Sequence, residues 1–217
     1  MKLALFDLDD TLIEGDCASL WGQYMQRLGW VTDPQFLLTE QTLMQQYAEG
    51  VLLMDDYMRF TLVPLIGRKP EDVAESVAHF IDDMIRPAIR PAAEQRVREH
   101  RERGDRLIVV SASGRHLVEP ISRCFGIEET LSIDLAVKEG RYTGLTQGTM
   151  TFREGKVTRL GQLLGDEKDR LLDSASFYSD SANDLPLLQR VGFPYVVNPD
   201  PVLLQHAQRA GWPVLNW

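Results

Sequence analysis

Apolar and polar positions follow two different patterns along this chain. Residues 3–6 form a short apolar run of the length of a buried strand, and the run ends at a group of aspartates. From residue 16 to about residue 85, apolar side chains recur at helical spacing without a strand pattern. From residue 86 onward, strand-like apolar runs alternate with helical stretches. This pattern predicts an α/β core that is interrupted by a block of helices.

The two patterns define an expected architecture. The helical block is expected to form a small bundle with helices at residues 17–28, 34–49, 55–66 and 70–85. The core is expected to contain strands at residues 3–6, 107–110, 131–137, 175–178 and 195–197. We therefore predict the α/β class, with a doubly wound parallel sheet as the core (residues 1–15 and 86–217) and an inserted helical-bundle cap (residues 16–85).

The composition argues against several classes of binding partner and metal site. The 23 basic residues and 32 acidic residues give a net charge of −9, which disfavours nucleic acid and anionic membrane surfaces as partners. Cys17 and Cys124 lack the spacing of a zinc site or a disulfide framework. The N-terminal apolar run is too short for a signal peptide, and no window has the length of a membrane span, so we expect a cytoplasmic protein. The oligomeric state is left open.

Polar side chains follow the predicted strands. Asp7 and Asp9 come directly after the first strand, and Ser111 follows the strand at residues 107–110. The second acidic cluster, with Asp180 and Asp184, follows the strand at residues 175–178. In an open α/β sheet, ligands bind beyond the carboxyl ends of the strands, so we expect these residues to share one site.

The expected site favours a hard cation. Carboxylates beside a low-dielectric core are costly unless they are paired, hydrogen-bonded or bound to metal. Asp7 and Asp9 lie two positions apart and point the same way along an extended chain. Oxygen ligands of this kind suit Mg²⁺, which we expect as the cofactor.

Each polar residue also has a structural explanation. Asp7 and Asp9 could form a turn or a helix cap, Ser111 could cap the helix that follows it, and Asp180 and Asp184 could cap another. Two acidic clusters at matching strand ends favour catalysis over these alternatives.

These residues carry a family resemblance. Residues 7–11, Asp-Leu-Asp-Asp-Thr, resemble the first motif, DxDxT, of the haloacid dehalogenase superfamily. Ser111 resembles the second motif, Lys156 the third and residues 179–184 the fourth, all in the right order. The helical block after the first motif resembles the cap of the phosphoserine-phosphatase-like branch, which is inserted into a Rossmann-like core.

The resemblance implies roles for the aspartates. Asp7 would be the nucleophile that forms an aspartyl-phosphate, and Asp9 would be the general acid and base. Asp7, Asp180 and the backbone carbonyl of Asp9 would bind Mg²⁺, with Asp184 also in the metal set.

Further residues are implied to hold the substrate. Ser111 and Lys156 would contact the transferring phosphoryl group, although a lysine is more often a solvated surface residue. Asn183, in the fourth motif, is assigned to substrate binding by the same resemblance.

Substrate choice is expected to lie in the cap. Asp16 occupies the place of a carboxylate that binds the substrate ammonium in phosphoserine phosphatases, and it could equally cap the first helix. Arg59 is the candidate for a clamp on a substrate carboxylate. Trp21, Tyr24 and Tyr57 could stack on an imidazole or could pack the cap.

The whole chain also looks like a bacterial subgroup that includes histidinol-phosphate phosphatases. We therefore expect a Mg²⁺-dependent phosphomonoesterase that acts on a small amino-bearing phosphate ester, with L-histidinol phosphate, from histidine biosynthesis, as the favoured substrate. Phosphoserine, from serine biosynthesis, is the alternative. A phosphotransferase that uses the same aspartate and a non-enzymatic receiver-like module remain as further hypotheses. Asp9 argues against the receiver-like module, which needs no general acid.

Overall fold

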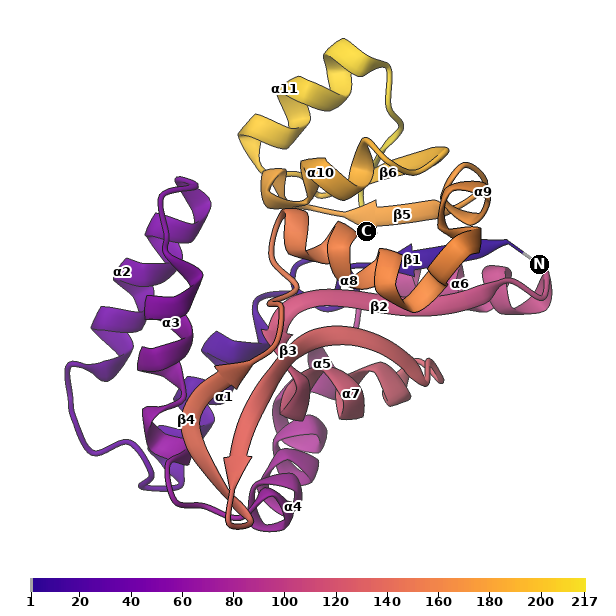
Figure 1. The fold of residues 1–217 in the computed structure, drawn as a ribbon. Coiled ribbons are helices and arrows are strands. Elements are labelled where there is room, and N and C mark those ends of the chain that lie inside the picture. The colour runs from indigo at the N-terminus through magenta and orange to yellow at the C-terminus, as the bar shows by residue number, and fades with distance from the viewer. Residues whose placement is uncertain (1) are drawn as a thin grey trace.

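A seven-stranded sheet forms the centre of the protein. The computed structural model describes residues 2–217, and the strand order of its sheet is β4-β3-β2-β1-β5-β6-β7 (Figure 1). The strands are β1 (Leu3–Phe6), β2 (Arg106–Gly114), β3 (Glu129–Lys138), β4 (Arg141–Gln147), β5 (Ser176–Ser179), β6 (Phe193–Val197) and β7 (Val214–Leu215). Neighbouring strands are parallel except β3 and β4, which form an antiparallel pair. The predicted α/β fold is confirmed.

The central strand β1 is buried on both faces. Ala4 and Phe6 belong to one apolar cluster, while Leu3 and Leu5 belong to the other. Successive side chains of a strand point to opposite faces of the sheet, so an unbroken apolar run is what a strand covered on both sides requires.

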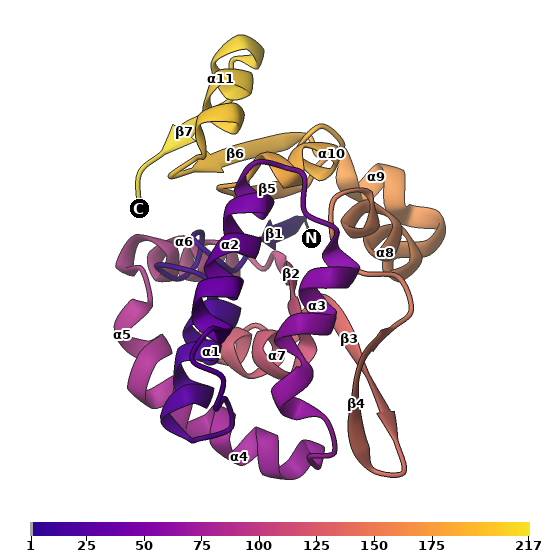
Figure 2. The ribbon, with the colours of Figure 1, turned by 90° about the vertical axis from the view of Figure 1, so that its left-hand side faces the viewer.

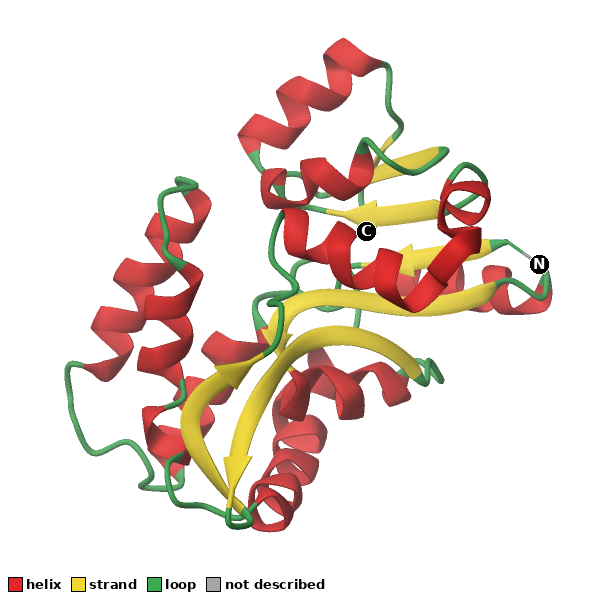
Figure 3. Cartoon of the chain, viewed as in Figure 1, coloured by secondary structure: helices red, strands yellow, loops and turns green. Residues whose placement is uncertain are grey.

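Helices cover both faces of the sheet (Figure 3). One apolar cluster includes α6 (Pro91–Glu102) and α7 (Arg115–Cys124). The other includes α8 (Glu154–Leu164), α9 (Lys168–Leu172), α10 (Leu185–Leu188) and α11 (Pro201–Ala210). None of the helices in residues 2–217 combines the length and the apolar composition needed to cross a membrane.

The helices between β1 and α6 lie partly beyond the carboxyl ends of the strands (Figures 1 and 2). They are α1 (Cys17–Arg27), α2 (Phe36–Ala48), α3 (Met54–Thr61), α4 (Pro70–Phe80) and the short α5 (Arg86–Ala88), with a 3₁₀ turn at Val63–Leu65 and a π-helical turn at Ile81–Ile85. The division into a cap at residues 16–85 and a core stays a prediction.

The β3–β4 hairpin joins the core to these helices. The backbone N–H of Gly67 donates to the carbonyl of Tyr142, and the N–H of Tyr142 donates to the carbonyl of Arg68, both at 2.9 Å. One buried cluster also runs continuously from the helical block into the core.

Two local features differ from the expected pattern. β2 does not end at residue 110 but continues to Gly114, and its pairing with β3 shifts in register between Val110 and Gly114. Ser111 therefore lies within an irregular part of the strand rather than after it.

Helix α11 is absent from the expected elements, although Asp200 before Pro201 is a helix start signal. The side chain of Asp200 accepts hydrogen bonds from the backbone N–H groups of Val202 and Leu203 at 2.8 Å.

Candidate active site

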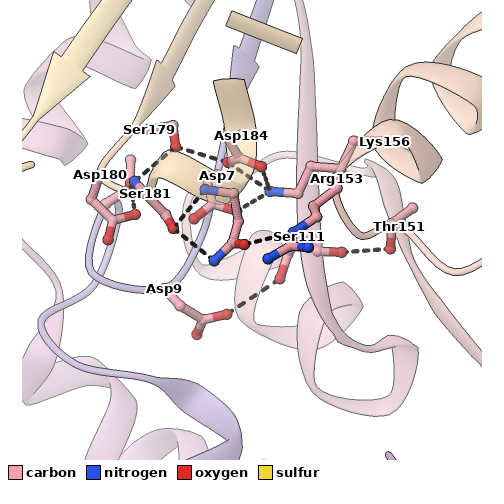
Figure 4. Close-up of polar contacts among 12 residues, drawn as sticks. Asp7, Asp9, Ser111, Thr151, Arg153, Lys156, Ser179, Asp180, Ser181 and Asp184 are labelled. Carbon is pink, nitrogen blue, oxygen red and sulfur yellow. Dashed lines mark hydrogen bonds and ion pairs between the residues drawn. The ribbon is translucent and has the colours of Figure 1, made fainter. Parts of the chain in front are cut away.

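The ends of β1 and β5 bring the two acidic motifs together. Phe6 is paired with Tyr178, and the backbone N–H of Asp7 donates to the carbonyl of Tyr178 at 2.9 Å. Asp7 and Asp180 therefore leave two adjacent strands at the same edge of the sheet (Figure 4). Residues about 170 positions apart in the sequence meet here because their strands are neighbours in a parallel sheet.

Lys156 joins this edge from the first turn of α8. Its side chain is buried, and its ammonium nitrogen lies 2.8 Å from Oδ1 of Asp7 and 2.7 Å from Oδ1 of Asp184. The preceding residue must be glycine, because a Cβ at Gly155 would lie 1.9 Å from the carbonyl oxygen of Met150. The backbone geometry before α8 thus depends on Gly155.

Asp184 faces Lys156. Its carboxylate accepts hydrogen bonds from Lys156 and from the hydroxyl of Ser179, both at 2.8 Å. The expected place of Asp184 in the metal set stays a prediction, and in this structure its carboxylate binds Lys156 and Ser179. The arrangement suits a residue that orients Lys156.

Burial and neighbouring charges shift the pKa values of Asp7 and Lys156. Burial raises the pKa of Asp7 from 3.8 to about 7, against the opposing effect of Lys156, and the nearby Asp184 and Asp9 raise it further. Although burial opposes it, the carboxylates of Asp184 and Asp7 raise the pKa of Lys156 above its ordinary value. Lys156 therefore keeps its positive charge beneath the site.

Asp180 lies in a crowded acidic environment. The hydroxyl of Thr11 donates to its Oδ1 at 3.1 Å, and no basic side chain forms an ion pair with Asp180 in the described residues. Burial, together with Asp7, Asp10 and Asp184, raises the pKa of Asp180 well above its ordinary value. A bound cation would relieve this repulsion.

The oxygen ligands at these strand ends suit Mg²⁺, and they do not suit a metal that needs all of its ligands from the protein. Residues 2–217 contain no group of three or more His, Cys, Asp or Glu side chains placed to hold an ion. Mg²⁺ commonly uses one or two carboxylates and completes its shell with water and substrate phosphate. Asp7 and Asp180 supply two such carboxylates at adjacent strand ends, so the fit does not require a third.

Asp9 is held by three donors. Its Oδ1 accepts from the backbone N–H of Cys17 at 2.7 Å, and its Oδ2 accepts from the hydroxyls of Ser113 at 2.8 Å and Ser111 at 3.3 Å. The backbone N–H of Ser113 in turn donates to the hydroxyl oxygen of Ser111 at 3.0 Å. The Cys17 contact ties Asp9 to the start of α1, and Ser113 is a site residue that the sequence analysis missed.

A cavity of about 230 Å³ opens above these residues. Its lining consists of Asp7, Asp9, Asp10, Asp16, Met44, Tyr47, Met54, Tyr57, Ala112, Ser113, Asp180, Ser181 and Asp200. The floor is acidic, and the walls from α2 and α3 are apolar or aromatic. Within the described part of the chain, none of the lining residues carries a basic side chain.

Asp16 both caps α1 and faces the cavity. Its Oδ1 accepts from the backbone N–H of Ser19 at 2.7 Å, which is the geometry of an N-cap. Burial, and next the charge of Asp9, raise the pKa of Asp16 well above its ordinary value. The two expected roles of Asp16 are therefore compatible in one position.

Arg59 does not reach the cavity. It lies on the exposed side of α3, whereas the buried face of this helix carries Met54, Tyr57 and Met58. The expected carboxylate clamp at Arg59 stays a prediction, and in this structure α3 turns the side chain to solvent.

Asn183 contacts both the core and the helical block. Its Oδ1 accepts from Arg153 at 2.9 Å, and its Nδ2 lies 3.4 Å from the carbonyl oxygen of Tyr47. Arg153 also donates to the carbonyl of Gly50 at 2.6 Å. These contacts connect the core to the α2–α3 connection, and the expected substrate contact of Asn183 stays a prediction.

The expected aromatic residues Trp21, Tyr24 and Tyr57, together with Tyr47, separate into two groups. Trp21 and Tyr24 stack on each other at a centroid distance of 5.7 Å and both contact Phe80 inside the helical block. Tyr57 and Tyr47 line the cavity. The sequence pattern could not separate these groups, because all four residues lie at apolar positions of helices.

Comparison with known proteins identifies the family. Residues 4–189 match the model of the haloacid dehalogenase-like hydrolases. This chain belongs to that family. Membership confirms the expected superfamily and shows that the protein is a hydrolase. The four motifs that carried the resemblance fall within the matched residues, and the site described above is where they meet.

Full-length similarity supports this assignment. A histidinol-phosphatase of Neisseria meningitidis serogroup C is 38% identical over 219 residues, covering 100% of this chain and 99% of that protein. A protein of unknown function from Bordetella pertussis Tohama I has a solved structure with a TM-score of 0.89 and 38% identity, covering 99% of this chain and 97% of that one. A substrate-bound phosphoserine phosphatase has the same fold, with a TM-score of 0.72 at 20% identity, covering 99% of this chain and 92% of that one.

Proposed function

We propose that this haloacid dehalogenase-like hydrolase removes phosphate from a small amino alcohol phosphate, with L-histidinol phosphate as the substrate. The observation that carries the proposal is the lining of the 230 Å³ cavity, which joins acidic groups to aromatic walls and contains no basic side chain in the described residues. A full-length relative that is 38% identical and named a histidinol-phosphatase supports the same substrate.

The phosphate end is formed by Asp7, Lys156 and Ser111. Lys156 offsets the negative charge of Asp7, which otherwise repels a phosphate dianion. The hydroxyl of Ser111, which donates to Asp9 in this structure, is available to a phosphoryl oxygen instead. Mg²⁺ held by Asp7, Asp180 and the backbone carbonyl of Asp9 would neutralise further phosphate charge.

Two aspartates carry the chemical steps in this proposal. A carboxylate oxygen of Asp7 attacks phosphorus, the ester P–O bond breaks, and protonated Asp9 gives its proton to the leaving alkoxide. Asp9 then removes a proton from water, whose oxygen attacks phosphorus and releases inorganic phosphate from Asp7. The Cys17 and Ser113 contacts keep Asp9 beside this reaction path.

The leaving-group end favours an ammonium over a carboxylate. Asp16 is the acidic group that can accept from a substrate ammonium at the cavity wall. The carboxylate of phosphoserine would meet no basic partner there, because Arg59 is exposed and the lining contains no basic side chain in the described residues. An amino alcohol phosphate needs the ammonium partner alone.

Phosphate release from a panel of esters tests the proposal. With Mg²⁺, we expect kcat/KM for L-histidinol phosphate to exceed that for phosphoserine by at least about tenfold, which corresponds to one unpaired charged group. Asp7→Asn should abolish release, and the exposed Asp166→Asn should leave it unchanged. EDTA should remove activity and added Mg²⁺ should restore it. A preference for phosphoserine, or transfer to an added alcohol in place of release, would contradict the proposal.

A further inference from the structure

Tyr57 presents a buried hydroxyl group without a protein partner. Its residue is 6% exposed on α3, and the oxygen has no hydrogen-bond partner in the described part of the chain. Buried polar groups are nearly always hydrogen-bonded, so an exception calls for an absent ligand or water. The hydroxyl can both donate and accept.

Tyr57 lies between two cavities of very different size. One is the 230 Å³ cavity above Asp7, and the other is a narrow space of about 20 Å³ lined by Glu40, Trp21 and His116. The narrow space has room for about one water molecule and not for an organic ring. A ring that reaches Tyr57 must therefore remain on the Asp7 side.

The walls beside Tyr57 suit a flat, nitrogen-bearing ring. Met44, Tyr47 and Met54 line the same cavity and offer thioether and aromatic surfaces that pack against a ring face. Burial, and next the charges of Asp16 and Glu40, raise the pKa of Tyr57 well above its ordinary value, so its proton stays in place. The acidic surroundings favour a leaving group with N–H donors or positive charge.

We propose that the Tyr57 hydroxyl recognises the distal part of the leaving group by hydrogen-bonding a nitrogen of a heteroaromatic ring. This inference rests on the proposed phosphatase function and adds a specificity residue to it. Asp16 binds the ammonium next to the phosphate, and Tyr57 distinguishes ring-bearing substrates from simple amino alcohol phosphates. In this arrangement Glu40, held by the hydroxyl of Ser19 at 2.5 Å, adds negative charge without touching the ring.

Tyr57→Phe tests the inference with little risk to the fold, because the hydroxyl it removes has no protein partner. The substrates are L-histidinol phosphate and phosphoethanolamine, which keeps the phosphate and ammonium and lacks the ring. We expect kcat/KM for L-histidinol phosphate to fall about tenfold more than that for phosphoethanolamine, mainly through KM. The inhibition constant of L-histidinol should rise by a similar factor.

The matched control is Tyr24→Phe. Tyr24 is also a buried tyrosine of the helical block, and it lines neither cavity. We expect this variant to keep the substrate ratio of the native protein. Thermal unfolding of both variants verifies that the fold is intact.

The outcomes separate this inference from the proposed function. If the native protein prefers L-histidinol phosphate and Tyr57→Phe keeps that preference, the Tyr57 inference is overturned and the proposed function stands. An equal loss for both substrates in Tyr57→Phe would indicate a structural role and would also overturn it. If the native protein does not prefer the ring-bearing ester, both proposals fail.

Discussion

Asp184 holds Lys156 with both carboxylate oxygens, at 2.7 Å and 2.8 Å from the ammonium nitrogen. Both side chains are buried, so this ion pair lies in a low-dielectric environment beneath Asp7. Lys156 thereby has a defined position with respect to the nucleophile before any substrate binds.

Asp184→Asn should lower both stability and turnover. The substitution leaves Lys156 with Asp7 as its single carboxylate partner, and loss of one member of a buried pair costs about 3 kcal/mol in the free energy of unfolding. Displacement of Lys156 should lower kcat by up to about a hundredfold with a smaller change in KM. Urea unfolding and steady-state kinetics measure the two effects. Retention of native kcat would show that Lys156 does not need Asp184.

Asp16→Asn should remove ammonium recognition and keep the helix cap. Asparagine caps helices as well as aspartate does, so the hydrogen bond from Ser19 can persist. We expect kcat/KM for L-histidinol phosphate to fall by about tenfold or more, and that for p-nitrophenyl phosphate, which has no ammonium, to change little. Arg59→Ala is the control for cap residues outside the cavity and should leave both substrates unaffected. Equal losses on both substrates in Asp16→Asn would contradict an ammonium site.

Arg153→Lys should weaken the contact between the core and the α2–α3 connection. Arg153 donates to the carbonyl of Gly50 and to Asn183 from two different nitrogens of its guanidinium group, and a single ammonium cannot reproduce both directions. We expect KM to rise about fivefold while kcat changes less, because this contact holds the α2 and α3 walls of the cavity against the core.

Hydrogen exchange gives a second measurement for Arg153→Lys. Backbone amides near Gly50 should exchange faster in the variant, whereas Arg170→Lys at the exposed surface should change neither KM nor exchange. Unchanged exchange near Gly50 would show that Arg153 does not hold the α2–α3 connection against the core.

His116 should make the protein less stable in acid. Burial of its ring nitrogens, which have no partner in the described residues, lowers the pKa of His116 from 6.5 to about 3. Between these values the unfolded chain binds a proton that the native protein does not, so the free energy of unfolding falls as pH decreases below 6.5. From pH 7 to pH 5 this group alone contributes a loss of about 2 kcal/mol.

Urea unfolding at the two pH values tests this prediction. His116→Leu should show a smaller loss of stability between pH 7 and pH 5 than the native protein, and the exposed His79→Leu should show the native loss. An equal pH dependence in all three proteins would mean that His116 accepts a proton in the folded state.

The strand ends illustrate what could be predicted from local pattern. The apolar run at residues 3–6 and the acids that follow it indicated both a buried strand and its polar end, because strand periodicity and side-chain polarity are local properties. The position of Lys156 beside Asp7 could be predicted only from the order of the family motifs, because a lysine at the start of a helix is usually solvated.

The missed residues depend on contacts that local pattern does not specify. Ser113 was overlooked because β2 continues past Ser111, and Arg153 because its partners lie on other elements. The pattern of α3 does not specify its rotation, which turns Arg59 to solvent and places Tyr57 at the cavity.

The sequence by itself determined the order of strands and helices, the four motifs and the acidic character of the site. The tertiary structure decided which carboxylates pair with Lys156, which cap residues line the cavity and which buried hydroxyls are left without a partner. The physical reason is that helix and strand patterns repeat over a few residues, whereas the site is built from residues as far apart as Asp7 and Asp180. The distances between such residues are set only when the strands pair and the helices pack.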